Sequence, residues 1–139
     1  MTTITDTTAA TDQVVDAFFT AFGSGDSETL LSLFAAPTDL RANGAPNVPW
    51  AGAQTTREGV ADFFGSFGRE LTAPESFEIH GRVTQGEDAV VFATCVFGVK
   101  STGKKFKNDL AMHFSVADGK ITRYHVYEDS YAIHEAFTS

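Results

Sequence analysis

The sequence predicts an α+β protein in which N-terminal helices pack on one face of an antiparallel sheet. Before Pro74, apolar residues recur with the 3.6-residue period of amphipathic helices. After Pro74, four stretches rich in β-branched and aromatic residues are separated by short turns, the pattern of a β-meander. Asp118-Gly119 lies between the last two stretches, and Asp-Gly in this position is a strong signal for a tight hairpin.

The first helix is expected over residues 12–22, with Thr11 or Asp12 as its N-cap. Its apolar residues recur at three- and four-residue intervals and share one face: Val14, Val15, Phe18, Phe19 and Phe22. Residues 1–11 are rich in threonine and lack an apolar run, so we expect a disordered or frayed tail there. A single domain is predicted over residues 12–137, because no repeat or low-complexity linker divides it.

Two further helices and a weak strand complete the first half of the chain. Asp26, or the serine that follows it, can cap a short helix that ends before Pro37, because the residue before a proline avoids helical geometry. That helix is expected to carry Leu30, Leu31, Leu33 and Phe34. A weak strand is predicted at 38–42, and a third helix starts at Thr55 or the next residue. The apolar face of the third helix consists of Val60, Phe63, Phe64 and Phe67.

Four strands are expected after Pro74. They are residues 77–84, 89–100, 105–117 and 120–128. Because the loops between them are short, each strand is expected to pair with the next in the antiparallel sense. A final helical turn is predicted at 131–137, with Asp129 or Ser130 as its cap.

Composition and charge argue against several classes of function. A net charge of −8 and a pI near 4.8 argue against nucleic acid as a partner, which requires a basic surface. The single cysteine, Cys95, excludes an internal disulfide and a zinc site built from several cysteines. The N-terminal residues resemble neither a signal peptide nor a membrane anchor. We therefore expect a cytoplasmic protein that does not bind a membrane.

Several short motifs follow one another between residues 12 and 137. They are Phe22-Gly23-Ser24-Gly25-Asp26, Val48-Pro49-Trp50-Ala51-Gly52, Thr56-Arg57-Glu58-Gly59-Val60-Ala61-Asp62-Phe63-Phe64, His113-Phe114, Asp118-Gly119-Lys120-Ile121, Tyr127 and Asp129. In their order and spacing they resemble the nuclear-transport-factor-two-like superfamily, which has the SnoaL-like or ketosteroid isomerase-like fold. The resemblance implies a cystatin-like α+β roll, in which a cone-shaped, curved antiparallel sheet wraps three N-terminal helices. It also implies a mostly apolar pocket at the open end.

The resemblance also implies which side chains face this pocket. The expected lining is mainly aromatic and aliphatic and consists of Phe18, Phe22, Asn43, Trp50, Phe63, Phe67, Cys95, Phe97, Leu110, Met112, Phe114, Tyr124 and Val126. Tyr124 or Asn43 is expected to give a ligand a hydrogen bond. Further polar contacts near the pocket mouth are expected from Glu128, Arg41 and Asn108.

The opposite face of the sheet is expected to be apolar as well, with Phe92 and Val96 pointing away from the pocket. A sheet that is apolar on both faces needs a second surface packed against its outer face. Members of the superfamily are usually dimers, so a homodimer through the sheet is the expected assembly.

This chain lacks the residues that the two best-known reactions of the superfamily require. Ketosteroid isomerase needs three proton-exchanging groups, and limonene epoxide hydrolase needs an Arg and two Asp. The aligned positions hold Phe18, Ala42 and Met112 for the isomerase, and Cys95, Phe97 and Val126 for the hydrolase. General acid–base catalysis has no partner at these positions, so we expect both activities to be absent.

Three functions remain, and whether the protein is an enzyme stays open. The aromatic lining favours a pocket that binds a small apolar molecule without assigned chemistry. One alternative is an isomerase, polyketide cyclase or hydrolase-like enzyme with a nonstandard acid or base, for which Asp129, Glu128 and His125 are candidates. A pocket carboxylate with a raised pKa would favour that alternative. A second alternative is a protein-interaction module that uses the sheet face. No metal or cofactor is expected, because the spacing typical of metal ligands is missing.

Overall fold

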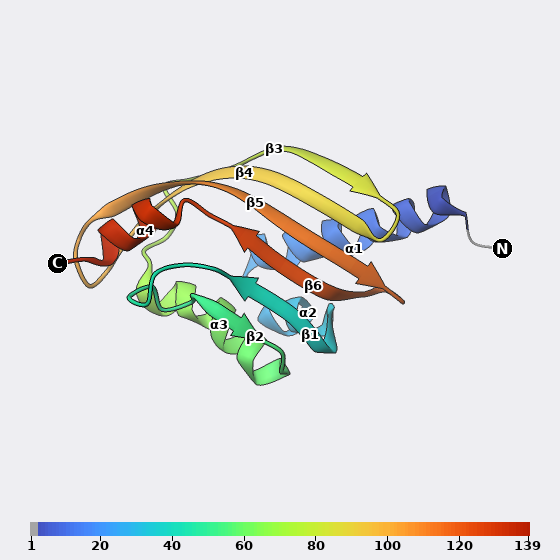
Figure 1. Ribbon diagram of the computed structural model, residues 1–139, viewed down its shortest axis with the longest axis horizontal. Helices are drawn as coiled ribbons and strands as arrows, with labels where there is room; N and C mark the ends of the chain where they lie inside the picture. The colour runs from blue at the N-terminus through green and yellow to red at the C-terminus, as the bar shows by residue number, and fades with distance from the viewer. Residues whose placement is uncertain (1–2) are drawn as a thin grey trace.

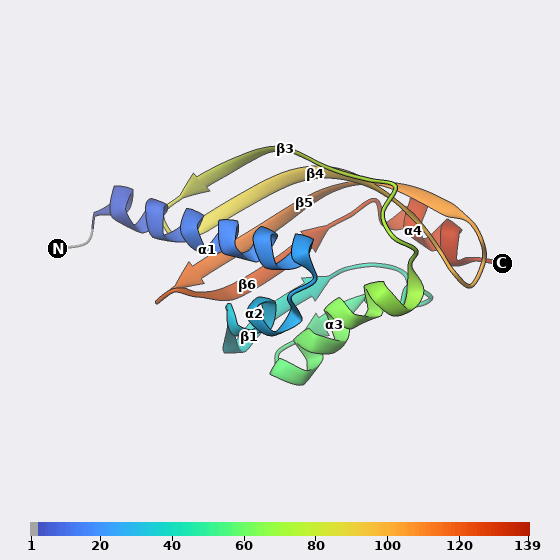
Figure 2. The same ribbon diagram turned by 180° about the vertical axis from the view of Figure 1, so that it is seen from behind.

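A strongly curved sheet and three helices on its concave side make up most of the molecule (Figures 1 and 2). The structure is a computed structural model, and it describes residues 3–139. The elements are α1 (Ile4–Ser24), α2 (Ser27–Ser32), β1 (Phe34–Ala42), β2 (Gly52–Gln54), α3 (Arg57–Glu70), β3 (Ser76–Gln85), β4 (Asp88–Gly98), β5 (Lys105–Ala117), β6 (Lys120–Tyr127) and α4 (Ser130–Phe137). Helices α1, α2 and α3 cover one face of the sheet, and α4 lies at one end of it. The predicted α+β class is confirmed.

The sheet has six strands in the order β2-β1-β6-β5-β4-β3. The antiparallel meander β3–β6 was expected from the short turns, and it is present. Strand β1 adds to it by pairing in parallel with β6, so that Leu40 lies opposite Tyr124. The short strand β2, which the sequence pattern did not predict, extends the edge beyond β1. The curved sheet is therefore built from strands of both halves of the chain, with β2 and β3 at its two edges.

Helix α1 begins at Ile4, whereas we expected it to begin near residue 12 after a frayed tail over 1–11. The first two residues of that tail lie outside the described residues. The next residue, Thr3, caps the helix: its hydroxyl accepts a hydrogen bond from the Asp6 N–H at 3.1 Å, and the Asp6 carboxylate accepts one from the Thr3 N–H at 3.4 Å. This capping box satisfies donors that would otherwise be exposed at the helix end.

The residues expected to cap α1 instead attach it to the sheet. Thr11 is buried inside the helix, and its hydroxyl donates to the carbonyl oxygen of Gly86 in the β3–β4 turn at 2.7 Å. The Gly86 N–H in turn donates to the Thr8 hydroxyl at 2.9 Å. Asp12 accepts a hydrogen bond from Arg82 on β3 at 3.2 Å. These partners are distant in sequence, so local capping rules could not identify them.

The second helix is shorter than expected and the strand after it is longer. Helix α2 ends at Ser32, and Phe34 already belongs to β1 rather than to the helix. The other predicted caps are confirmed. Asp26, Thr56 and Asp129 each accept a hydrogen bond from a backbone N–H three residues further on, at 3.2, 3.0 and 3.1 Å.

The concave side of the sheet has a packed end, which we define by Val15, Phe18, Leu40, Phe114 and Ile121. Each of these side chains is at most 1% exposed. The ring of Phe18 on α1 contacts that of Phe114 on β5, with centroids 5.0 Å apart, and that of Tyr124 on β6 at 5.3 Å. The Phe18–Phe114 contact is edge-to-face, and Phe114 is completely enclosed by its neighbours.

Candidate functional site

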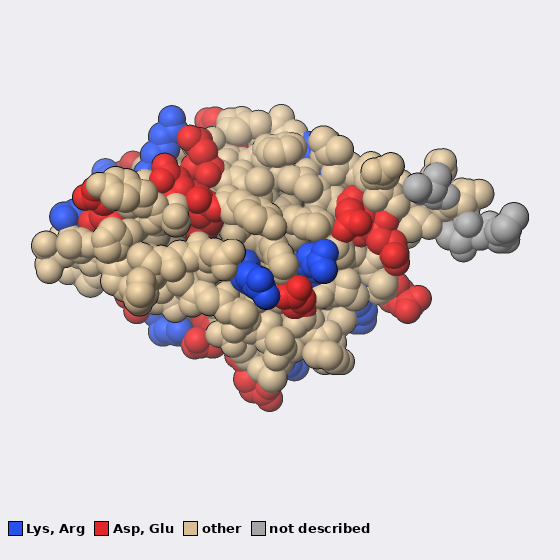
Figure 3. Space-filling view, in the orientation of Figure 1, with Lys and Arg blue, Asp and Glu red and all other residues tan. Residues whose placement is uncertain are grey.

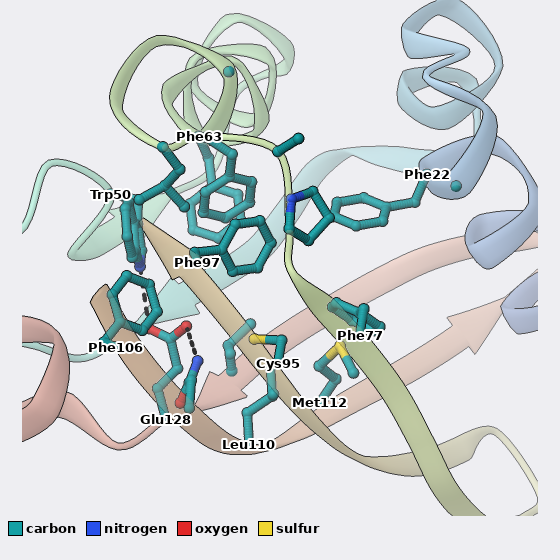
Figure 4. A pocket seen from close by; sticks show the side chains of 18 of the residues that line it. Phe22, Trp50, Phe63, Phe77, Cys95, Phe97, Phe106, Leu110, Met112 and Glu128 are labelled. Atoms are coloured by element: carbon teal, nitrogen blue, oxygen red, sulfur yellow. Dashed lines mark hydrogen bonds between the residues drawn. The ribbon is translucent and has the colours of Figure 1, made fainter. Parts of the chain in front are cut away.

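A cavity of about 760 Å³, partly open to solvent, lies beside the packed end on the same concave face (Figure 4). Strands β4, β5 and β6 form one wall, while α1, α3 and the segment 71–74 form the other. The volume falls within the usual range of small-molecule sites. All of the predicted lining residues except Asn43 and Phe114 border it. We call this region the cavity end of the sheet.

The two exceptions have different causes. Phe114 faces the concave side as expected, but it is completely buried between Phe18 and Tyr124 at the packed end. Asn43 is exposed in the loop after β1 and does not reach the cavity. Arg41, another expected polar contact, is also exposed and lies outside the lining. The alternation of β1 explains this, because its neighbours Leu40 and Ala42 point inward.

Trp50 is held in the cavity wall by rings from two helices. Its side chain is 5% exposed and lies edge-on to Phe67 of α3, with centroids 5.1 Å apart, and to Phe137 of α4 at 5.5 Å. The indole N–H donates to Oε2 of Glu128 at 3.1 Å. The loop between β1 and β2 thereby contributes both an apolar surface and a hydrogen-bond donor to the site.

Glu128 follows β6 and brings a carboxyl group to the cavity. Its Oε1 accepts a hydrogen bond from Nδ2 of Asn108 at 3.2 Å. The Asn108 Oδ1 accepts one from the Asp129 N–H at 2.9 Å, which fixes the orientation of the Asn108 amide. Burial raises the pKa of Glu128 above its ordinary value, although the hydrogen bonds from Trp50 and Asn108 act in the opposite direction.

The other two titratable groups in the inner wall stay neutral at physiological pH. Burial, together with the nearby charge of Glu128, raises the pKa of the Cys95 thiol to about 12. The same two causes raise the pKa of Tyr124 above its ordinary value. A thiol that remains protonated is a poor nucleophile, so Cys95 acts as part of the wall. Among residues 3–139, no group hydrogen-bonds the Tyr124 hydroxyl, which leaves it free for a ligand.

Of the three candidate catalytic residues, only Glu128 borders the cavity. Asp129 is exposed and caps α4, accepting a hydrogen bond from the Ala132 N–H. His125 lies on the outer face of the sheet, where its Nε2 is 3.0 Å from Oδ2 of Asp39. The strand pairing accounts for the difference: His125 lies opposite His113 on the outer face, whereas its neighbour Val126 lies opposite Met112 on the inner face.

The positions aligned with the two enzyme templates mostly face this cavity. It is lined by Phe18, Met112, Cys95, Phe97 and Val126, while Ala42 is buried outside the lining. The sequence reasoning missed Phe77 and Phe106. Phe106 lies opposite Phe97 in the β4–β5 ladder, and strand alternation could have placed it on the same face.

Within the described residues, no cluster of three or more His, Cys, Asp or Glu side chains could hold a metal ion. In the same part of the chain, no helix is long and apolar enough to cross a membrane.

Solved structures with the same architecture define the class as NTF2-like. An NTF2-like protein from Burkholderia xenovorans LB400 is 26% identical, with a TM-score of 0.83 over 94% of this chain and 98% of that one. TerC, co-crystallized with polyporic acid, is 21% identical, with a TM-score of 0.80 over 94% and 99%. An LEH-like epoxide hydrolase from M. tuberculosis is 17% identical, with a TM-score of 0.71 over 94% and 90%. At their identities, the last two share the fold alone.

Within that class, the family model of the SnoaL-like domain matches residues 15–124, and the chain belongs to this family. The expected resemblance to the NTF2-like superfamily is thereby confirmed. No curated protein matches the sequence.

Proposed function

We propose that the cavity binds a small, mainly apolar organic molecule, which Glu128 and Tyr124 orient through hydrogen bonds. The observation that carries the proposal is the cavity itself: about 760 Å³ of space lined mostly by apolar side chains, with few polar groups. Small-molecule sites typically combine an apolar wall with a few placed polar groups. A similar fold, that of TerC, has been crystallized with the organic molecule polyporic acid.

Binding can be tested with N-phenyl-1-naphthylamine, a neutral apolar dye whose emission increases in dry surroundings. We expect saturable binding to the native protein and loss of that binding in Val126→Trp, which fills the cavity from β6. Val83→Trp is the matched control, because Val83 is 63% exposed. If the native protein does not bind the dye, or if Val126→Trp binds it as well as the control does, the proposal is wrong.

A second candidate function is catalysis with Glu128 as a nonstandard acid or base. The observation that favours it is the raised pKa of this carboxyl group, which faces a cavity with no other acidic side chain among residues 3–139. The test is deuterium exchange at the α-carbon of 2-tetralone in D₂O, followed by NMR. We expect exchange above the buffer rate in the native protein and its loss in Glu128→Gln. Equal rates in both would remove this candidate.

We also propose a homodimer through the outer face of the sheet. Figure 3 shows an uncharged area on this face next to a small group of charged side chains, and Phe92 and Tyr127 are 44% and 56% exposed on the face. Exposed apolar patches on sheets mark interaction surfaces. Sedimentation at micromolar concentration should give a dimer, and Phe92→Asp should give a monomer. A native monomer would contradict the proposal and would favour contact with another protein instead.

A further inference from the structure

Lys100 and Glu128 both border the cavity, but they differ in how exposed they are and in what they contact. Lys100 is an exposed residue, and its ammonium group donates to the Gly68 carbonyl oxygen at 2.9 Å. Glu128 is partly buried in the wall, and within residues 3–139 no cationic side chain pairs with it. A buried carboxylate without a counter-ion is unfavourable, because the low-dielectric surroundings replace its hydration poorly. The Glu128 carboxyl group thus has no counter-ion within residues 3–139.

The hydrogen bonds of Glu128 show which protonation state the wall is built for. Both protein groups that contact the carboxyl oxygens, the Trp50 indole N–H and the Asn108 amide, are donors. The Asn108 amide cannot turn to offer its oxygen without losing the Asp129 N–H. A protonated carboxyl group would need an acceptor, and among residues 3–139 none hydrogen-bonds it. A carboxylate has about four lone-pair positions, so roughly two remain for donors from a ligand.

Aromatic rings lie beside the same carboxyl group. In Figure 4 the Trp50 indole is joined to the Glu128 carboxyl group by its N–H hydrogen bond. The rings of Phe97 and Phe106, which stack with centroids 6.1 Å apart, border the same cavity. The faces of aromatic rings attract cations, and the attraction increases where water is excluded. A carboxylate in a cavity lined by rings therefore favours a positive group over a neutral one of the same size.

We infer that the cavity selects molecules that combine an apolar body with a protonated amine, which binds between the Glu128 carboxylate and the rings of Phe97 and Phe106. This inference rests on the proposed function and specifies its ligand class. The apolar body fills the space lined by the rest of the wall, including Leu110 and Met112. The ammonium group donates hydrogen bonds to the free positions of the carboxylate, and such charge-assisted bonds are stronger than neutral ones.

The experiment compares three probes that share one apolar body: 2-naphthylmethylamine, 2-naphthylmethanol and 2-naphthoic acid. Their affinities for the native protein are measured by calorimetry at pH 7. Trp50, the single tryptophan of the chain, gives an independent fluorescence readout. We expect the amine to bind about tenfold more tightly than the alcohol, and the acid to bind most weakly, since a positive group gains both ionic and cation–π contacts.

Two variants test whether the charge of Glu128, rather than the shape of the cavity, causes the preference for the amine. Glu128→Gln should weaken binding of the amine by about tenfold while changing the affinity for the alcohol by less than about twofold. Glu78→Gln is the matched control, because it removes one negative charge at an exposed position of β3. That control should leave all three affinities unchanged.

The outcomes also separate the inference from the proposed function. If the native protein binds the alcohol as tightly as the amine, or if Glu128→Gln weakens both equally, the ligand class is wrong while the binding function stands. If neither these probes nor the neutral dye binds, both are wrong. The native protein alone decides the first question, so the test does not depend on how well Glu128→Gln folds.

Discussion

The packed end and the cavity end lie on one face of one sheet, and the same strands contribute to both. On β5, Phe114 is completely buried under α1, whereas Met112, two residues away, lines the cavity. On β6, Ile121 belongs to the packed end and Val126 to the cavity wall. Helices α1 and α2 cover the first region, while the C-terminal part of α1, α3 and the segment 71–74 form the wall over the second (Figure 2). Strand alternation therefore decides which face a residue takes, and the helices decide whether it meets other side chains or space.

The largest expected difference between the two ends concerns removal of a ring. Phe114→Ala should lower the free energy of unfolding by about 3–5 kcal/mol, because the space it leaves is enclosed by other side chains. Phe97→Ala should lower it by less than about 2 kcal/mol, because this ring is only partly buried and already borders space. Urea denaturation of both variants measures the difference. Equal losses would mean that Phe97 belongs to a closed core and that the cavity is absent.

Enlarging a side chain should separate the two ends again. Val126→Trp should change the free energy of unfolding by less than about 1 kcal/mol, because the cavity can accept the indole. Ile121→Trp should cost about 3 kcal/mol or more, because its side chain is 0% exposed at the packed end. Thermal unfolding, followed by circular dichroism, measures the stability of both variants. A Val126→Trp protein that does not fold would contradict the open wall.

The two ends also predict opposite pH effects on stability, and Glu128 gives the first. Its pKa is raised in the folded protein, so above the ordinary value of 4.5 the native state keeps a proton that the unfolded state has released. The unfolding free energy of the native protein should therefore fall, relative to that of Glu128→Gln, as pH rises from about 4 to 7. Urea denaturation of both proteins across this range checks the sign. A rising difference would mean that hydrogen bonds outweigh burial.

The smallest effect is expected for Asp88, which lies on the outer face beside the packed end. Hydrogen bonds from Ser115 and His113 lower its pKa below 3.8. Its contribution to stability is therefore present above that value and is lost as pH falls through the lowered pKa. Asp88→Asn should be slightly less stable than the native protein at pH 7, by less than about 1 kcal/mol because the carboxylate is exposed. The two should converge as pH falls through the lowered pKa.

Most of the architecture could be predicted from the sequence because the signals were local. The cap at Asp26, the turn at Asp118-Gly119 and the alternation of β5 each involve neighbouring residues. The start of α1 was placed too late although its signal, the Thr3 and Asp6 capping box, is local. What could not be predicted from local signals is the attachment of Thr8 and Thr11 to the distant turn at Gly86. Phe114 was placed on the correct face but not at the correct end, because only the path of α1 decides that.

The candidate site was predicted less completely, and Glu128 shows the reason. Its side chain can act as an acid or base, which made it a candidate, but Asp129 and His125 were candidates on the same ground. Only the three-dimensional contacts with Trp50 and Asn108 distinguish it, and both partners are far from it in sequence. A sequence pattern cannot report the hydrogen bonds that join the β1–β2 loop and β5 to the residue that follows β6.

The parallel pairing of β1 with β6 has a consequence for how the protein forms during synthesis. The Thr38 hydroxyl donates to the Ile121 carbonyl oxygen, and these residues are 83 positions apart. Helices α1–α3 and strands β1 and β2 leave the ribosome long before β6 has been made. Until then, the edge of β1 that pairs with β6 in the folded protein has no partner strand. Contacts between such distant segments form slowly, because a long loop must close first. We expect the nascent chain to need protection of that edge until residues 120–127 have been made, which is when the cone can close.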